Sequence, residues 1–325
     1  MALIKSTNYA PDVFRSLHGI LLIYKPPCIT SRNLVDELKG RIADSLNSLQ
    51  PRPIATRLVI EGGLNDEKRI VEAPNLADHP LVSGPRYNPW DISLSFAKST
   101  LSYRSSGLGV ILLGSANKYF REKISRARLV STYHITGRFG YMTDTFFYDG
   151  KIIDKSTFRH IQLGKLDSVL SRIESVQSER LFDSASVPLD SQEAYELAKA
   201  WPSRPPKMAR WPVIYRLKCI HLKLPVFKIE VAVVNETETF LAQLCNDIGI
   251  MLKSRAFTES IRRVKQGPFH VSQSLTDAEW DLQSIINNLT IYNARHKELH
   301  AYLGRHRLAM SIDGEQESDR CSLKV

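Results

Sequence analysis

The sequence predicts an α+β domain in which strands and helices follow one another irregularly. Two segments, Val213–His221 and Val226–Val234, alternate apolar and polar residues, which is typical of an antiparallel pair with one covered face. A third segment, Val110–Leu113, is an unbroken apolar run of the kind found in strands buried on both faces. Because the helical stretches between strands follow no regular repeat, an α+β domain is favoured over a doubly wound sheet.

The composition is that of an ordinary globular protein with a basic excess. The 325 residues suffice for one large domain or two modest ones, with 43% hydrophobic and 24% charged residues. No apolar stretch reaches the roughly 18–20 residues that span a bilayer. The net charge of +10 favours anionic partners, with nucleic acid first. The four cysteines lack metal-binding spacing, so no metal site is predicted.

The first third of the chain predicts a strand, a turn and a capped helix. The strand is His18–Tyr24, and Lys25-Pro26-Pro27 ends it. Thr30 or Ser31 can cap a helix over residues 33–39, since a hydroxyl satisfies free N–H groups there. Residues 41–90 are polar and are interpreted as a divergent insertion over the core. Residues 1–16 form an N-terminal extension that matches a transit peptide only faintly.

The middle of the chain combines a loop, a buried strand and a basic helix. Ser105-Ser106-Gly107 is predicted to be a turn before the strand at Val110–Leu113. A basic segment follows, in which Glu122 is the one acidic residue among five cations. A loop beside a core strand and a basic helix is a usual place for chemistry and for phosphate. The predicted RNA-binding cations of this segment are Lys118, Arg121, Lys123, Arg126 and Arg128.

The second half predicts further strands and helices, ending in a polar tail. Residues 133–148 are rich in β-forming residues, and Thr237 begins a helix that runs through Ile248 to a C-cap at Gly249. A second basic group, made of Arg262, Arg263 and Lys265, is also predicted to bind RNA. Residues 277–289 form a last amphipathic helix, and residues 291–325 are expected to be disordered.

Seven segments, taken in order over residues 17–285, resemble the motifs of the TruB family of RNA pseudouridine synthases, nearest to its divergent mitochondrial branch. Leu101–Gly107 resembles the catalytic loop Leu-Asp-x-x-Ala-Ser/Thr-Gly, and Tyr133 matches the tyrosine of the Lys-x-Tyr motif. The remaining matches are His18–Ser31, Phe139–Thr145, Glu193–Lys199, Thr239–Gly249 and Ile261–Phe269.

The resemblance implies a fold, an activity and a setting. The implied fold is the pseudouridine synthase fold, with a mixed, mainly antiparallel sheet flanked by helices. The separate C-terminal RNA-binding domain of the family is expected to be absent, so residues 17–290 would form the synthase domain alone. The family flips a uridine out of its stack and isomerises it through a nucleophilic aspartate, without cofactor or metal. A tyrosine stacks on the base, which would be the role of Tyr133. The implied partners are mitochondrial mRNA, tRNA or rRNA and RNA-processing proteins in the mitochondrial matrix, with no membrane.

This sequence departs from the family at the two residues that carry the chemistry. The aspartate position, five residues before Gly107, is Ser102, and alignment on Gly109 instead places Arg104 there. The arginine that pairs with the aspartate is replaced by Ala242. The absence of the aspartate and the absence of the arginine are expected together, because an arginine left buried without its partner is destabilising. A serine needs an adjacent base to act as a nucleophile, and none matches.

Three functions therefore remain open from the sequence. The first is an RNA-binding homologue with impaired or no isomerase activity, a pseudoenzyme. The second is an active RNA pseudouridine synthase that uses a relocated carboxylate such as Asp91 or Asp144. The third is a scaffold that makes no RNA contact, which predicts negligible and salt-insensitive RNA affinity, whereas phosphate binding weakens steeply with salt.

Overall fold

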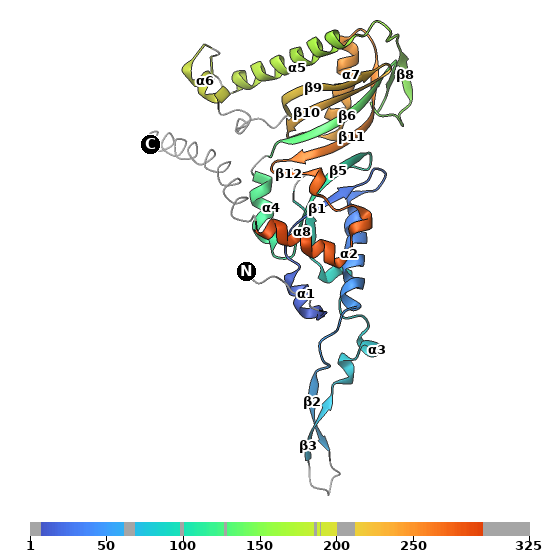
Figure 1. Ribbon diagram of the computed structural model, residues 1–325, viewed down its shortest axis with the longest axis vertical. Helices are drawn as coiled ribbons and strands as arrows, with labels where there is room; N and C mark the ends of the chain where they lie inside the picture. Colours follow the sequence, from blue (N-terminus) through green and yellow to red (C-terminus); the bar gives the residue numbers. More distant parts are fainter. Residues whose placement is uncertain are drawn as a thin grey trace, which may run out of the picture.

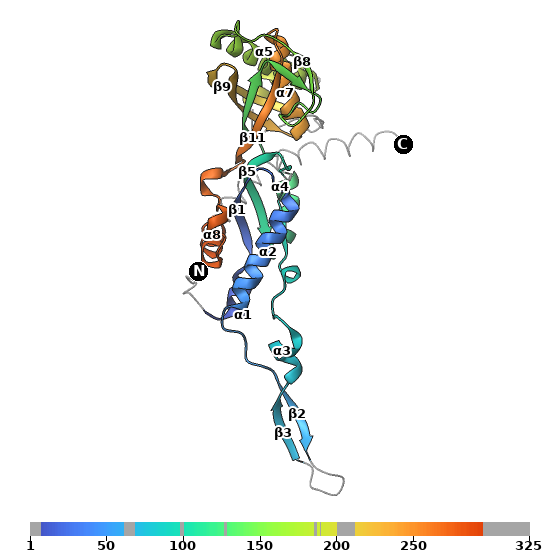
Figure 2. The ribbon, with the colours of Figure 1, turned by 90° about the vertical axis from the view of Figure 1, so that its right-hand side faces the viewer.

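The computed structural model describes residues 8–61, 69–97, 101–126, 129–184, 187–188, 190–199 and 212–294. The molecule is elongated, with one twisted sheet running through its middle (Figures 1 and 2). The strands are β1 (Gly19–Lys25), β2 (Thr56–Glu61), β3 (Arg69–Pro74), β4 (Leu94–Phe96), β5 (Ser105–Leu113), β6 (Ser131–Phe139), β7 (Tyr141–Thr143), β8 (Ile152–Lys155), β9 (Val213–Lys223), β10 (Val226–Val234), β11 (Ala256–Gln266) and β12 (Phe269–His270).

The helices flank this sheet in an upper and a lower group. In Figure 1, α5 and α7 lie in the upper part, and α1, α2, α4 and α8 lie in the lower part. None of the helices in the described residues is long and apolar enough to cross a membrane. The helices are α1 (Ala10–Ser16), α2 (Ser31–Asn47), α3 (Pro80–Ser83), α4 (Ala116–Arg126), α5 (Leu163–Ser184), α6 (Gln192–Lys199), α7 (Glu238–Met251) and α8 (Leu282–Ala294).

The sheet topology confirms the predicted mixed, mainly antiparallel fold. The strand order is β1-β5-β11-β6-β10-β9, with β4 added to β5 and β12 added to β11. Pairing is antiparallel everywhere except between β5 and β11, which run parallel. This single parallel contact joins the lower strands β1 and β5 to the upper strands β11, β6, β10 and β9.

Strand β5 is buried along its whole length, as its apolar run predicts. Leu108, Val110 and Leu112 pack with Phe120 and Ile124 of α4 on one face. Ile111 and Leu113 pack with residues of α2 and α8 on the other face. The interpretation of residues 105–107 as a turn was wrong, because these small residues begin the strand. Their size lets β11 pair closely, and the hydroxyl groups of Ser105 and Ser106 both have hydrogen-bond acceptors.

The upper sheet has one covered face and one open face. Residues 131, 133, 135, 137 and 139 of β6 are buried, and the residues between them are partly exposed. The buried side packs against α5 and α7 through a large apolar cluster that includes Leu166, Leu170, Leu241 and Ile248. This confirms the one-sided burial expected for the antiparallel pair β9–β10.

Two helices are longer than the sequence predicted. Helix α2, capped by the Thr30 hydroxyl, continues to Asn47 rather than ending near residue 39. Helix α7 passes through Gly249 and ends at Met251. Gly249 serves packing instead of capping, because a Cβ atom there would lie 2.7 Å from the backbone nitrogen of Ala256.

Residues 41–47 continue α2 and bury Ile42, Ala43 and Leu46 in the core, but much of the rest of residues 41–90 does not cover the core as expected. After α2 the chain leaves the body, and the antiparallel pair β2–β3 projects from one end of the molecule (Figures 1 and 2). Leu58, Ile60 and Ile70 on this hairpin are 66–70% exposed. The local sequence of such a hairpin does not determine whether a core lies against it.

A row of four residues in register crosses the junction between the two halves of the sheet. Lys25 pairs with Gly107, Gly107 pairs with Arg263, and Arg263 pairs with Tyr133. Register partners share a face of a sheet, so the side chains of Lys25, Arg263 and Tyr133 lie on the same side. Lys25 and Arg263 are both 0% exposed. Lys25 Nζ donates to the carbonyl oxygen of Ser105 at 2.8 Å, and Arg263 Nε donates to that of Leu108 at 2.8 Å.

We expect Gly107→Ala to destabilise the protein strongly. Gly107 has φ +108°, and a Cβ atom there would lie 2.2 Å from the backbone oxygen of Arg263. The free energy of unfolding should fall by about 3 kcal/mol or more. Gly40→Ala is the matched control, since a Cβ at Gly40 in α2 meets nothing within 4 Å and should stabilise by about 0.5–1 kcal/mol. Urea unfolding of both variants measures this, and equal effects would refute the close β5–β11 approach.

Burial also predicts a pH dependence for Lys25. It lowers the pKa of this ammonium group from 10.5 to about 8, and the nearby Glu238 carboxylate offsets only part of the effect. Between these two pH values the unfolded chain binds a proton that the folded chain does not, so stability should rise with pH.

We therefore expect the wild type to gain about 2–3 kcal/mol relative to Lys25→Met across this window. Unfolding both proteins in urea at each end of the window measures the difference, in which other titrating groups cancel. A difference that stays constant with pH would contradict a lowered pKa for Lys25.

Candidate active site and RNA-binding residues

The candidate active site lies where the N-termini of α2 and α7 reach the row formed by Lys25, Gly107, Arg263 and Tyr133. Thr30 caps α2 by accepting from Asn33 N, and Thr237 caps α7 by accepting from Phe240 N. Capping hydroxyls of this kind explain why both helices begin at the junction. Because helix N-termini carry partial positive charge, the junction favours anionic groups.

The loop that carries Ser102 is held by the turn after β1. Ser31 Oγ donates to the carbonyl oxygen of Leu101 at 2.6 Å, and the Cys28 amide donates to that of Tyr103 at 2.9 Å. Cys28 has φ +64°, a left-handed conformation that favours glycine. These bonds tie the two segments that the sequence linked to the opening motif and to the catalytic loop.

Ser102 is exposed on this loop and has no general base. Its Oγ accepts a hydrogen bond from Arg104 N at 3.3 Å. Within the described part of the chain, no histidine or carboxylate is hydrogen-bonded to this hydroxyl. His134 lies on the open face of β6, opposite Tyr133, as strand alternation predicts. Ser102 is therefore not activated as a nucleophile in this structure.

Two carboxylates that the sequence analysis did not single out lie close to the loop of Ser102. Glu238, the first residue of α7, accepts from Ser105 Oγ at 2.9 Å. Burial raises its pKa, while the Ser105 hydroxyl, Arg104 and Lys25 oppose that shift. Asp149 accepts from Arg104 at 2.8 Å, and the Arg104 guanidinium lies 4.9 Å from the centre of the Phe147 ring. No motif match marked either carboxylate, because their proximity depends on how α7 and the loop after β7 pack.

Tyr133 is buried beside charged groups on the same side of the sheet. Its hydroxyl donates to Glu236 Oε1 at 2.7 Å, and burial raises the pKa of the phenol. Tyr133 belongs to the core cluster under α7 and is 4% exposed. Stacking on a base would require this ring to become more exposed than it is here.

Ala242 lies one turn along α7 from Glu238 and is 0% exposed. It belongs to the same apolar cluster as Tyr133, and its carbonyl oxygen accepts from Thr258 Oγ1 at 3.3 Å. The side chain of Ala242 therefore packs in the core and brings no charge to the site.

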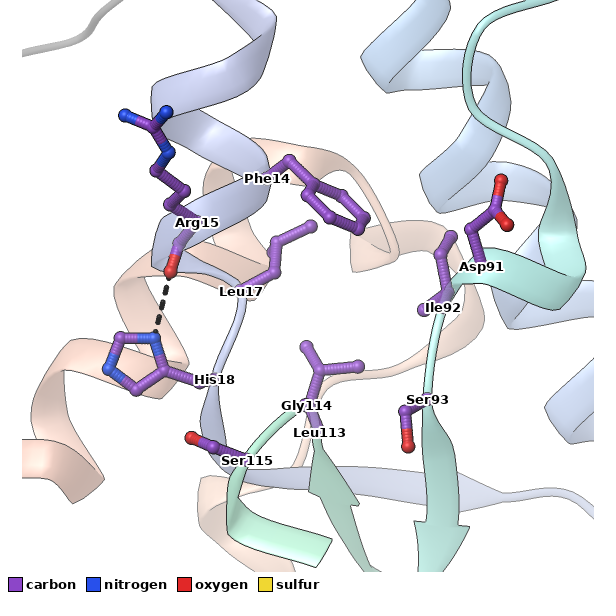
Figure 3. Close-up of a pocket in the computed structure, with 10 residues that line it drawn as sticks. All are labelled: Phe14, Arg15, Leu17, His18, Asp91, Ile92, Ser93, Leu113, Gly114 and Ser115. Atoms are coloured by element: carbon purple, nitrogen blue, oxygen red, sulfur yellow. Dashed lines mark hydrogen bonds between the residues drawn. The ribbon is translucent and has the colours of Figure 1, made fainter.

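The carboxylates of Asp91 and Asp144 accept hydrogen bonds from their own local turns and not from residues of this junction. Asp91 caps a short 3-10 helix by accepting from Asn88 N, and it lines a pocket of about 270 Å³ beside Leu113 and Gly114 (Figure 3). That pocket is at the opposite end of β5 from Ser105. Asp144 Oδ1 accepts from the amides of Thr145 and Lys151, which is the turn role expected for it.

The basic segment after β5 forms α4, as predicted. Phe120 and Ile124 bury one side of this helix, which leaves Lys118 and Arg121 exposed and Lys123 half-buried. The side chain of Arg126 and all of Arg128 lie outside the described residues. The described cations of α4 are thus available to a partner.

The predicted grouping of Arg262, Arg263 and Lys265 needs a correction. Arg262 and Lys265 are exposed, but Arg263 is fully buried on the opposite side of β11. The reason is strand alternation, which turns neighbouring side chains to opposite faces. Arg263 is part of the junction with Tyr133, and the Arg262 guanidinium lies 5.4 Å from the centre of the Tyr24 ring.

The sequence of this chain is similar to those of known proteins. The N-terminal domain of the TruB family pseudouridylate synthases matches residues 98–239. The chain is 33% identical over 285 residues to the mitochondrial pseudouridylate synthase TRUB2 of Xenopus tropicalis, covering 86% of each chain. It is 30% identical to the Mus musculus protein of the same name, covering 90% of each. An archaeal box H/ACA sRNP Nop10–Cbf5 complex has a TM-score of 0.44 at 12% identity, covering 88% of this chain and 58% of that chain.

The resemblance carried by the seven ordered segments is thereby confirmed. The identity to TRUB2 extends over most of both sequences, well beyond the matched N-terminal domain. The protein belongs to the TruB family of pseudouridine synthases, in the branch of the mitochondrial TRUB2 proteins.

Proposed function

We propose that this protein is an RNA-binding TruB homologue of the mitochondrial matrix whose isomerase activity is lost or severely impaired. The observation that carries the proposal is the pair Ser102 and Ala242, which stand where the family has its nucleophilic aspartate and the arginine that pairs with it. The surroundings support it. No described histidine or carboxylate is hydrogen-bonded to Ser102, and Ala242 is closed into an apolar core.

The choice of Gly107 as the motif glycine supports the assignment of Ser102. Gly107 has a positive φ and touches the β11 backbone, whereas Gly109 has no such conformation. Only Gly107 thus requires glycine on conformational grounds. The alternative alignment would put Arg104 at the aspartate position, and Arg104 is also not a carboxylate.

RNA binding is assigned to the exposed cations of α4 together with Arg262 and Lys265. Five of the eight cations predicted from the sequence are described and at least partly exposed: Lys118, Arg121, Lys123, Arg262 and Lys265. The named relatives act as pseudouridylate synthases in mitochondria, and we propose mitochondrial mRNA, tRNA or rRNA as partners, together with RNA-processing proteins.

A second candidate is an active synthase with a relocated carboxylate. Glu238 favours this candidate, because its half-buried carboxylate contacts Ser105, which is three residues after Ser102 in the chain. The same carboxylate also lies near Lys25. Asp149 is less suitable, since Arg104 already binds its carboxylate. Asp91 is set aside because it lies at the far end of β5.

The test of catalysis is tritium release from RNA that carries 5-tritiated uridine, with a pool of mitochondrial RNAs as substrate. We expect no release by the wild type and measurable release by the double variant Ser102→Asp, Ala242→Arg, because the two lost groups are then restored. Ser102→Asp alone is the control for a fold disturbed by an arginine in α7. Release by the wild type would refute the proposal, and its loss in Glu238→Gln would then identify the relocated carboxylate.

The test of RNA binding uses Lys118→Gln, Arg121→Gln on α4. Each cation that contacts a phosphate of single-stranded RNA contributes about 0.7 to the slope of log Kd against log salt, so the slope should fall by about 1. The matched control is Lys165→Gln, Arg172→Gln, two exposed cations of α5. Negligible RNA affinity of the wild type at every salt concentration would instead support the scaffold hypothesis.

A further inference from the structure

The upper sheet has a face that none of the described helices covers. Helices α5 and α7 both pack on the side of Tyr133 and Phe227, and no described helix packs on the other side of β6, β9, β10 and β11. At one end of that side Val213, Tyr215 and Val234 form a small buried cluster, and the rows beyond it are exposed or partly exposed. We call this side the open sheet face. It carries four rows in register: Arg216–Ala232–Thr132–Lys265, Lys218–Glu230–His134–Arg262, His221–Lys228–Thr136–Ser260 and Lys223–Val226–Arg138–Phe257.

Every row of the open sheet face carries at least one lysine or arginine. The seven are Arg138, Arg216, Lys218, Lys223, Lys228, Arg262 and Lys265, against the two acids Glu230 and Glu259. Arg138 pairs with Glu259, and Glu230 lies 3.5 Å from His134. Burial and the charge of Lys228 lower the pKa of His134, so the positive charge of the face at neutral pH rests on lysine and arginine.

The cations are spread over an area that suits a polyanion. Neighbouring strands are about 4.8 Å apart, so Arg216 and Lys265 are separated by about 14 Å across the sheet. The four rows extend along β6 from Thr132 to Arg138, or about 20 Å. Lys223, Arg216, Lys218, Arg262 and Lys265 are exposed, and no ion pair holds them among the described residues. Their charge is therefore available to a ligand.

The open sheet face continues the basic surface of α4. Phe120 and Ile124 of α4 pack against Leu108 and Val110 of β5, on the side opposite to Ile111 and Ile23. Leu129 and Val130 connect α4 to β6, and Lys265 pairs with Thr132 just beyond them. The α4 cations therefore run toward Lys265 and on to β10 and β9.

We propose that the open sheet face is an RNA-binding platform that grips backbone phosphates on the side of the sheet opposite to Tyr133 and Lys25. The proposal rests on the RNA-binding function proposed above and extends its surface from α4 across to β9. An RNA strand on this platform would be held by Lys and Arg contacts to phosphate, without base readout, which gives affinity rather than sequence specificity.

RNA fits this face better than a protein partner does. Lysine is depleted in protein interfaces, whose centres are apolar and aromatic. On the described strands β6, β9, β10 and β11, Ile220 is the one exposed large apolar side chain, at 44%. A face with four lysines and three arginines, and with threonine hydroxyls between them, instead offers donors to phosphate.

The test compares three variants with the full-length wild type in binding fluorescent single-stranded polyuridine RNA over a range of salt. The platform variant is Arg216→Gln, Lys218→Gln, Lys223→Gln, all exposed on β9. The matched control is Arg159→Gln, Lys165→Gln, Arg172→Gln near or on α5, which has the same loss of charge. The α4 variant Lys118→Gln, Arg121→Gln is measured in parallel.

We expect the platform variant to bind about tenfold more weakly or worse, with the salt slope reduced by about 2, while the control stays at the wild-type value. Equal binding by the platform variant and the control overturns the platform. If the α4 variant is weakened in that case, the proposed RNA-binding function still stands, and if neither is weakened, both fail. Competition by polyaspartate as effective as that by RNA at equal charge overturns the choice of RNA over an acidic protein.

A second measurement needs no variant and so does not depend on folding. Wild-type protein is crosslinked to RNA containing 4-thiouridine, and the crosslinked peptides are mapped. Peptides from β9 and β10 support the platform, and crosslinks confined to α4 and the junction beside Tyr133 overturn it.

Discussion

The close parallel contact between β5 and β11 at Gly107 is the constraint on which the rest of the structure depends. Gly107 touches the Arg263 backbone so closely that no side chain fits between the strands. Among the described strands, this contact joins the lower strands to the upper strands, since every other neighbouring pair in the order β1-β5-β11-β6-β10-β9 stays within one half. It also places two buried cations, Lys25 and Arg263, on either side of one glycine.

Those two cations explain how polar groups are arranged at the junction. A buried charge is tolerated only when hydrogen bonds and opposite charge compensate for lost solvation. Backbone oxygens of Ser105 and Leu108 accept from the two side chains, and Glu238 lies nearby. The junction is therefore a polar framework that lies beside the loop of Ser102 and the buried Tyr133.

The two faces of the upper sheet are suited to different tasks. On one face, α5 and α7 bury an apolar cluster and leave Tyr133 in the core. The other face stays open and carries the cations of four strands. Side chains alternate along a strand, so β11 places Arg263 in the junction and exposes Arg262 and Lys265 to solvent on its other side. Buried and solvent-exposed cations are thus separated within a single strand.

The sequence by itself determined the element types, the α+β class and the family, because apolar periodicity, caps and ordered motifs are local properties. It identified β5, the pair β9–β10 and the basic helix α4. The prediction that Ser102 and Ala242 depart from the family rests on the sequence motifs alone. Tertiary structure alone decided the burial of Arg263, the approach of Glu238 and Asp149, and the outward course of β2–β3. Each of these features depends on which segments, distant in sequence, pack together. Strand register and helix docking determine that packing only when the whole chain is folded.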